Sequence, residues 1–341
     1  MNRGSRHRLR FLAAILLLAI ALLCLSVAPA AAFDIPHAAL WQCDSAIDLG
    51  TLPNGGYSYA NGINVRGQIV GIARDYKNRY QAVTWCGGKI CTLPLLPDST
   101  GNSDAQGINA LGQIVGWCTD ATGHDEAVLW FRGKATQLPN PPDSLTCYAH
   151  SINALGQVVG SAYPSYNYGE PVAVSWWRGK VTVLPNLPGM AWASARCINA
   201  AGQIVGWAGN GASIRAVLWS RGMVKDLGFL PGGDYSCACG INDLGQVVGY
   251  ASIDPGVYHA FLWRNGVMTD LGTLPGGSSS SAYAINNRGQ VVGKAETASQ
   301  GIHAFLWENG KMTDLGPAPT GFYWEAAAIN LLGQIVGGQG L

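Results

Sequence analysis

The sequence predicts an all-β fold, a seven-bladed β-propeller built from four-stranded antiparallel blades. Two markers repeat in step along the chain, a motif Ile-Asn-x-x-Gly-Gln and a single tryptophan, each seven times at intervals of 43 to 46 residues. A unit of this length cannot bury its own apolar face, so repetition indicates a modular β architecture. The markers are Ile63, Ile108, Ile152, Ile198, Ile241, Ile285 and Ile329, and Trp41, Trp85, Trp130, Trp176, Trp219, Trp263 and Trp307.

One unit shows the four expected strands most clearly. Short runs of apolar, β-branched and aromatic residues span positions 259–263, 267–271, 282–285 and 290–293. Turn residues separate these runs: Asn265-Gly266 is a strong hairpin signal, and the sequence from Asn286 to Gly289 fits a type I turn. Runs this short, punctuated this closely by turns, are typical of strands.

Constant spacing within the unit predicts two tight hairpins. The interval from each marker tryptophan to the leucine of the next run is always 8 residues, as is the interval from each marker isoleucine to a following strand glycine. Tight hairpins fix strand register and therefore forbid insertions. Length varies between the strand glycine and the next tryptophan, from 13 to 16 residues. We expect this connection to be an exposed loop, on the same face as the Leu-Pro-Gly-Gly loops.

The repeats are expected to close into a ring. The chain opens with a tryptophan-type hairpin at residues 38–49 and ends with an isoleucine-type hairpin at residues 326–337. These halves complement each other and predict one composite blade. An open β-solenoid is the alternative, but blade-length units without a polar capping repeat favour the ring.

The N-terminus resembles a secretory signal peptide. Arginines precede an apolar run at residues 11–27, which an alanine-rich stretch follows, so we expect cleavage after Ala32, with Ala30 as the second choice. An uncleaved membrane anchor is the alternative. The prediction is a signal peptide at residues 1–32 and one propeller domain at residues 33–341, secreted to an extracellular or periplasmic location.

The amino-acid composition limits the classes of binding partner that we expect. Cleavage would remove four of the 21 basic residues and none of the 20 acidic ones, leaving 17 basic and 20 acidic residues and a net charge of −3. Without a basic cluster, nucleic acid is not an expected partner, nor is a membrane once the signal is removed. We expect a monomer. Eight cysteines would remain, an even number that permits disulfides without choosing their pairing.

Two families share features of the repeat. The strand order resembles that of WD-repeat propellers, which implies that Gln-Val-Val-Gly is the innermost strand and that the tryptophans pack between blades. The segments 259–263, 270–277, 282–286 and 303–307 resemble the bacterial extracellular HAF repeat, named for His-Ala-Phe. That resemblance covers the chain from His37 onward, is looser in the earlier repeats, and implies no established activity and no catalytic residues.

Recurring polar residues are expected to serve the fold. His37, His259 and His303 each stand four residues before a marker tryptophan, where a strand-start hydrogen bond is favoured over a metal site. A second column precedes the marker leucines and is expected to cap turns; it comprises Asp48, Asp226, Asp270 and Asp314. The Cys237-Ala238-Cys239 sequence is weak evidence for metal or redox chemistry, and a Cys86–Cys91 disulfide is not favoured because the two are diagonal partners. No catalytic residue, metal or cofactor is predicted.

Positions that vary within this frame are the candidate ligand-binding residues, since they are free to specialise. After the strand glycines they include Trp117, Trp207, Tyr250 and Lys294. In the variable loops they are Tyr76, Tyr80, Asp120, Asp125, Tyr163, Tyr166, Tyr168 and Tyr258. Aromatic groups mixed with polar ones suit contact with a sugar, peptide or protein.

The leading hypothesis is therefore a non-catalytic binding scaffold for a carbohydrate, peptide or protein. One alternative is an extracellular enzyme, such as a polysaccharide lyase or hydrolase acting at the central channel, which would require Asp120, Asp125 or Asp254 to converge with a histidine in a deep pocket. The other is a structural surface protein, for which neither face should be concave or rich in aromatic residues.

Overall fold

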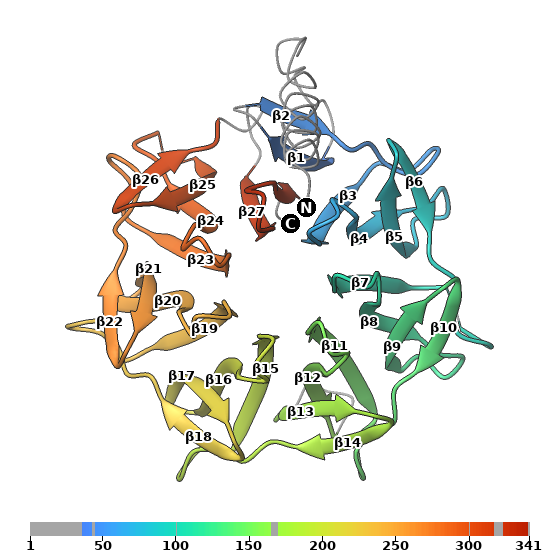
Figure 1. The fold of residues 1–341 in the computed structure, drawn as a ribbon, viewed down its shortest axis with the longest axis horizontal. Helices are drawn as coiled ribbons and strands as arrows, with labels where there is room; N and C mark the ends of the chain where they lie inside the picture. Colours follow the sequence, from blue (N-terminus) through green and yellow to red (C-terminus); the bar gives the residue numbers. More distant parts are fainter. Residues whose placement is uncertain are drawn as a thin grey trace, which may run out of the picture.

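The computed structural model describes residues 36–42, 45–99, 101–164, 170–299, 301–316 and 323–339. The 28 strands of these residues form seven four-stranded antiparallel sheets, arranged as blades around a central axis (Figure 1). This confirms the predicted ring. None of the described residues forms a helix long and apolar enough to cross a membrane, and the signal-peptide segment 1–32 lies outside them.

Each blade has an inner strand, two middle strands and an outer strand. The inner strands are β3 (Ser58–Ile63), β7 (Ser103–Ile108), β11 (Thr146–Ile152), β15 (Trp192–Ile198), β19 (Ser236–Ile241), β23 (Ser280–Ile285) and β27 (Trp324–Ile329). The second strands are β4 (Ile69–Arg74), β8 (Ile114–Thr119), β12 (Val158–Tyr163), β16 (Ile204–Asn210), β20 (Val247–Asp254), β24 (Val291–Glu296) and β28 (Ile335–Gln339). The third strands are β5 (Tyr80–Cys86), β9 (Asp125–Phe131), β13 (Val172–Trp177), β17 (Ser213–Ser220), β21 (Val257–Arg264), β25 (Ile302–Glu308) and β1 (Ala38–Gln42). The outer strands are β6 (Lys89–Thr92), β10 (Lys134–Gln137), β14 (Lys180–Val183), β18 (Met223–Asp226), β22 (Val267–Asp270), β26 (Lys311–Asp314) and β2 (Ser45–Asp48).

One blade joins the two ends of the described chain. Its strand order is β2-β1-β28-β27, so two N-terminal strands pair with two C-terminal ones. Trp41 lies opposite Ile335 and Ala39 opposite Gly337 in the antiparallel register between β1 and β28. The predicted composite blade is confirmed, and its backbone hydrogen bonds hold the ring closed.

The strand order within each blade corrects one expectation. The Gln-Val-Val-Gly strand is the second strand, and the strand that ends in Ile-Asn is the innermost (Figure 1). The reason lies in a β-bulge: the register between β3 and β4 shifts between Ala60 and Gly62. There the carbonyl oxygen of Tyr59 lies 2.0 Å from where a Cβ on Gly71 would stand. The strand glycine therefore accommodates a bulge of the inner strand rather than crowding at the axis.

The marker tryptophans pack between blades, as predicted. Trp130 lies in an apolar cluster with Val70 of the preceding blade and with Ala105 and Ile114 of its own blade. Its indole N–H donates a 2.7 Å hydrogen bond to the carbonyl of Pro94, in the loop that joins the two blades. Trp176 and Trp219 make the same bond to Pro139 and Pro185, so these three indoles contribute both apolar area and a hydrogen bond between neighbouring blades.

The asparagine of the Ile-Asn motif links all seven blades. The Asn64 side-chain amide donates a 3.0 Å hydrogen bond to the main-chain carbonyl of Asn109, the equivalent residue of the next blade. The pattern continues around the ring until Asn330 donates to the carbonyl of Asn64 at 3.0 Å. Each side-chain oxygen also accepts from the backbone N–H four residues on, as Asn64 does from Gln68 at 3.1 Å. The motif thus forms a closed ring of buried hydrogen bonds, which we call the asparagine ring.

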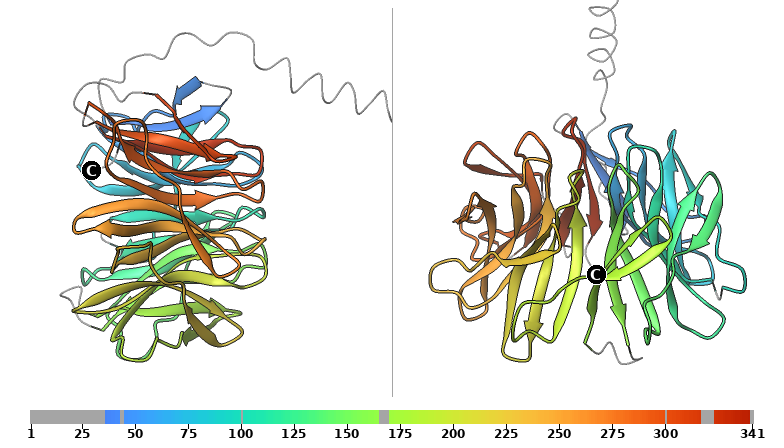
Figure 2. Two further views of the ribbon diagram at one scale, coloured as in Figure 1. Left: turned by 90° about the vertical axis from the view of Figure 1, so that its left-hand side faces the viewer. Right: turned by 60° about the horizontal axis from the view of Figure 1, so that its bottom comes forward.

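The disc, which the left view of Figure 2 shows edge-on, has two different faces. The asparagine ring lies on one face. The opposite face, here called the loop face, carries the connections between second and third strands and those between blades. These connections contact each other: Thr119 donates its N–H to the carbonyl of Asn102 at 2.9 Å, and the Ser99 hydroxyl donates to the carbonyl of Thr119 at 2.6 Å. The prediction that both sets of loops share a face is confirmed.

Candidate binding site

The inner strands direct a different side chain into the central channel from every blade. These residues stand two positions before the marker isoleucine, and they line a cavity of about 270 Å³ above the isoleucines. We call them the channel positions; they are Asn61, Gln106, His150, Arg196, Cys239, Tyr283 and Ala327.

On the loop face the channel widens into a pocket of about 660 Å³, here called the funnel. Its walls combine channel positions with Tyr59, Asp104 and Glu325 of the inner strands, and with Tyr80 and Trp117 farther out. The volume lies within the range of small-molecule sites. This concave, aromatic-lined surface is unlike what a purely structural protein would require.

Glu325 is held in a polar cluster at the funnel wall. The hydroxyls of Tyr59 and Tyr283 donate to its carboxylate at 3.1 and 3.3 Å, and Lys294 Nζ lies 3.0 Å from Oε2. Burial, together with the nearby Glu325 charge, raises the pKa of Tyr59 well above its usual value. The two hydroxyls therefore stay protonated and keep donating, while the lysine balances the charge of the carboxylate.

Asp104 is a buried carboxyl on β7, two blades away from Glu325 on β27. It accepts hydrogen bonds from Asn61 Nδ2 at 2.8 Å and from Gln106 Nε2 at 2.5 Å. Burial raises its pKa to about 7, although the two amides act in the opposite direction. This group consequently changes charge close to neutral pH.

Arg196 projects into the channel from β15 and is exposed there. It forms no ion pair with any residue in the part of the chain that the structure describes. Burial, followed by the charge of Arg196, lowers the pKa of His150 to about 3. His150 is therefore a neutral neighbour of the guanidinium at ordinary pH, with Nε2 lying 3.2 Å from Ser161 Oγ.

Two aromatic clusters, here called the rim clusters, are built around Trp117, which lines the funnel, and Tyr250, which lines the channel. Tyr148 makes edge-to-face contacts with Trp117 and Tyr163, with ring centroids 6.0 and 5.7 Å apart. In another blade, Tyr235 stacks on Tyr250 at 5.9 Å and meets Tyr258 edge-on at 5.4 Å. Such contacts hold the rings in fixed orientations around the opening.

Several predicted residues are brought together in this way. Tyr80 and Trp117 line the funnel, Tyr250 lines the channel below it, Lys294 pairs with Glu325, and Tyr163 and Tyr258 belong to the rim clusters. Tyr80 also lies under the guanidinium of Arg74, 4.7 Å from its ring centroid.

Other predicted residues lie elsewhere. Tyr76 is 67% exposed at a loop tip beside Lys77, whose Nζ is 5.3 Å from its ring centroid. Trp207 is half-buried on β16, opposite Ser194. Tyr166 and Tyr168 fall outside the described residues.

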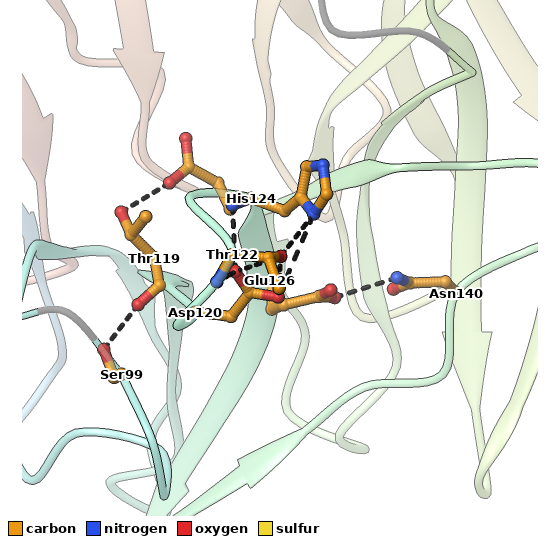
Figure 3. A network of polar contacts seen from close by, with 8 residues as sticks. Ser99, Thr119, Asp120, Thr122, His124, Glu126 and Asn140 are labelled. Atoms are coloured by element: carbon orange, nitrogen blue, oxygen red, sulfur yellow. Dashed lines mark hydrogen bonds and ion pairs between the residues drawn. The ribbon is translucent and has the colours of Figure 1, made fainter.

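Asp120 stabilises its own loop (Figure 3), whereas Asp125 bonds to Thr119 and to the next blade. Asp120 Oδ1 accepts from the backbone N–H of Thr122 at 2.8 Å and of His124 at 2.9 Å. Burial acts to raise the pKa of Asp120, but these bonds outweigh it and leave the pKa below its usual value. Asp125 accepts from the hydroxyls of Thr119 at 2.6 Å and Tyr148 at 2.7 Å. Asp254 is exposed at the end of β20. These acids do not converge with a histidine in a deep pocket of the described structure.

The histidine and aspartate columns pair with each other across the third and outer strands. His259 Nδ1 lies 2.8 Å from Asp270, whose other oxygen accepts the N–H of Gly272 at 2.7 Å. The equivalent pairs are His37–Asp48 and His303–Asp314, each at 2.8 Å. Strand-start and turn-capping roles are confirmed. Within the described residues, no three His, Cys, Asp or Glu side chains are grouped to hold a metal ion.

The seven cysteines that the structure describes are all unpaired. Cys237 and Cys239 line the channel beside Arg196, while Cys86 and Cys91 are exposed on an outer hairpin. Cys43 lies outside the described residues.

The channel positions are the residues that sequence reasoning missed. Their signal was present in the sequence: in the segment Ala-x-x-Ile-Asn, the residue after alanine is of a different type in each of the seven repeats. It was passed over because the neighbouring strand was expected to be innermost.

Comparisons with known proteins agree on the fold. No family model and no curated protein matches the sequence. Among solved structures, a Mycobacterium tuberculosis puromycin-hydrolyzing peptidase is 10% identical, with a TM-score of 0.54 over 80% of this chain and 47% of that chain. The chain thus spans about half the length of that peptidase, and at this identity the likeness shows the fold alone. The fold is a seven-bladed β-propeller.

Two further structures are more distant. The Aleuria aurantia lectin AAL is 13% identical, with a TM-score of 0.42 over 79% of this chain and 98% of that chain. TolB from Acinetobacter baumannii is 15% identical, with a TM-score of 0.46 over 80% of this chain and 63% of that chain. Neither likeness carries an argument about function.

Proposed function

We propose that this propeller is a binding scaffold whose ligand enters the funnel from the loop face. The observation that carries the proposal is the variety of the channel positions: seven blades with one frame present seven different residue types to the same space. A symmetric ring with an asymmetric lining is suited to an asymmetric ligand. Regular residues, such as the tryptophans and the asparagine ring, serve the frame itself.

The lining favours a polar ligand of modest size. Amide, carboxyl and hydroxyl groups of Asn61, Gln106, Glu325 and Tyr283 can donate or accept hydrogen bonds, and Trp117 offers an aromatic surface. A concave pocket of about 660 Å³ is suited to a small molecule or to the end of a saccharide or peptide chain. It is less suited to the flat surface of a partner protein.

Export belongs to the same proposal. The basic start, the apolar run at 11–27 and the alanine-rich segment that follows support a cleaved signal, and the resemblance to extracellular HAF repeats agrees with it. Sequencing the N-terminus of the protein recovered from outside the cytoplasm tests this directly. We expect Phe33 as the first residue; an intact N-terminus would contradict it.

A glycan and peptide array tests the binding role. Trp117→Ala should weaken binding of any ligand found on the array by about tenfold or more, because it removes an aromatic surface that the bound ligand would cover. Trp177→Ala is the matched control, since Trp177 is 37% exposed on β13 and lies away from the funnel. Equal binding by both variants, or no binding by the wild type, would contradict the proposal.

A further inference from the structure

The central channel holds one cation, Arg196, that has no ion-pair partner among the described residues. Lys294 neutralises Glu325 through their 3.0 Å ion pair. Asp104 is 8% exposed, accepts two amide hydrogen bonds and has a pKa of about 7, so near neutral pH it is partly uncharged. An arginine remains charged at all relevant pH values, so the Arg196 guanidinium presents a positive charge to a ligand in the channel. Arg74 also forms no ion pair among the described residues, but its guanidinium lies over the rings of Tyr57 and Tyr80 at the funnel wall.

Within the described ranges, Arg196 has no carboxylate neighbour in the part of the channel that it lines. It shares a part of the channel with Gln106, His150, Tyr283 and the two thiols Cys237 and Cys239. His150 is neutral because its pKa is about 3, and burial keeps the pKa of Tyr283 above its usual value. A lone cation inside low-dielectric walls concentrates its field on the opening, which favours an anion there.

We propose that Arg196 binds a carboxylate of the ligand, and that this ligand is an acidic saccharide of the uronic-acid class. The inference rests on the proposed binding function and names its substrate class. The planar guanidinium matches a carboxylate through two parallel hydrogen bonds. A phosphate or sulfate ester would call for several free cations, whereas Lys294 is paired with Glu325 and Arg74 lies over the rings of Tyr57 and Tyr80.

The rest of the lining favours a sugar over a peptide as the source of that carboxylate. Sugar hydroxyls both donate and accept hydrogen bonds, and the funnel lining contains donors and acceptors. These are the amides of Asn61 and Gln106, the carboxylate of Glu325 and the hydroxyl of Tyr283. Trp117 and Tyr80 supply the apolar surfaces on which the C–H faces of a pyranose can rest.

Calorimetric titration with matched oligosaccharides tests the inference. One probe is an oligogalacturonate; the other is the same oligosaccharide with every carboxylate reduced to a hydroxymethyl group. Wild-type protein should bind the acidic probe about tenfold to hundredfold more tightly, the range expected of a charge-assisted hydrogen-bonded pair. Arg196→Gln should abolish that preference, and Arg196→Lys should keep part of it because the charge remains.

Arg264→Gln is the control, because it removes the same charge from an exposed position at the end of β21. It should leave the preference unchanged. Arg196 is itself exposed, so we expect the melting temperature of Arg196→Gln to match the wild type, which separates loss of binding from loss of fold.

Different results would overturn different claims. If the neutral probe binds equally well, or if the acid preference survives in Arg196→Gln, the inference about Arg196 fails. The proposed binding function would still stand if Trp117→Ala weakens binding of the probe. A peptide with a free C-terminal carboxylate that binds more tightly than either sugar, and loses that advantage in Arg196→Gln, would overturn the saccharide assignment. No binding of any probe by the wild type would contradict the proposed function as well.

Discussion

The side-chain amide of Asn330 donates a 3.0 Å hydrogen bond to the main-chain carbonyl of Asn64, 266 residues away along the chain. This bond completes the asparagine ring, while β1 and β28 complete the composite blade farther from the axis. Two independent sets of hydrogen bonds therefore close the propeller. The recurrence of the Ile-Asn motif follows from this arrangement, because every blade must both donate and accept in the ring.

Asn330→Ala should lower the free energy of unfolding by about 1–3 kcal/mol, since it removes one of the two donors to the Asn64 carbonyl and leaves two turn N–H groups without their acceptor. Urea-induced unfolding measures the change. Leu332→Ala in the same turn is the control, because Leu332 is 67% exposed and should cost little. Equal costs for the two variants would show that the ring contributes nothing beyond the turn.

Gly71→Ala should destabilise the protein by about 3 kcal/mol, because the new Cβ would lie 2.0 Å from the carbonyl oxygen of Tyr59 and the bulged inner strand would have to move. Gly56→Ala is a suitable comparison, with no atom within 4 Å of its added Cβ. Thermal unfolding of both variants distinguishes them. A mild effect at Gly71 would argue against the bulge geometry.

Trp176→Phe and Trp85→Phe form a matched pair. Both indoles are buried, but Trp176 Nε1 donates to the carbonyl of Pro139 at 2.7 Å, whereas Trp85 Nε1 has no hydrogen-bond partner among the described residues. The first substitution should cost about 1 kcal/mol more than the second, the net worth of one hydrogen bond. Chemical denaturation gives both values, and a larger loss at Trp85 would contradict the assigned role of the inter-blade bond.

Asp104 should make stability depend on pH. Its carboxyl has a pKa of about 7 when folded, above its ordinary value, so the folded state holds a proton that the unfolded chain has lost. Stability contributed by this group is therefore present at low pH and falls as pH rises from about 4 to about 7. The difference in unfolding free energy between wild type and Asp104→Asn should change across that window in favour of the variant. Parallel pH curves would rule out the raised pKa.

Much of the fold could be predicted because a constant interval between marker residues indicates a fixed strand register. The constant interval between Trp263 and Leu271 reflects a hairpin that tolerates no insertion, and the complementary hairpins at the two ends anticipated the pairing of β1 with β28. The identity of the innermost strand could not be read in this way. The resemblance to WD-repeat propellers implied that the strand containing Gly71 is innermost, but this glycine faces a carbonyl of a bulged neighbour, and a bulge leaves no trace in apolar spacing.

The candidate site was predicted in part for the same reason. Trp117 and Tyr80 vary within the frame and do line the funnel, so variation was a useful guide. The inner-strand residues that complete it, such as Arg196 and Gln106, were hidden by the strand order. Asp120 and Asp125 vary as well, yet Asp120 bonds within its own loop, and Asp125 bonds to Thr119 and to Tyr148 of the next blade. Variation therefore also occurs where a residue only stabilises its surroundings.

A crystal structure of the protein with a ligand selected on the array tests the central claim most directly. The account predicts that the ligand lies in the funnel on the loop face, within hydrogen-bonding distance of the channel positions Asn61, Gln106 or Arg196. A ligand bound instead on the asparagine-ring face, or between two blades away from the channel, would contradict it.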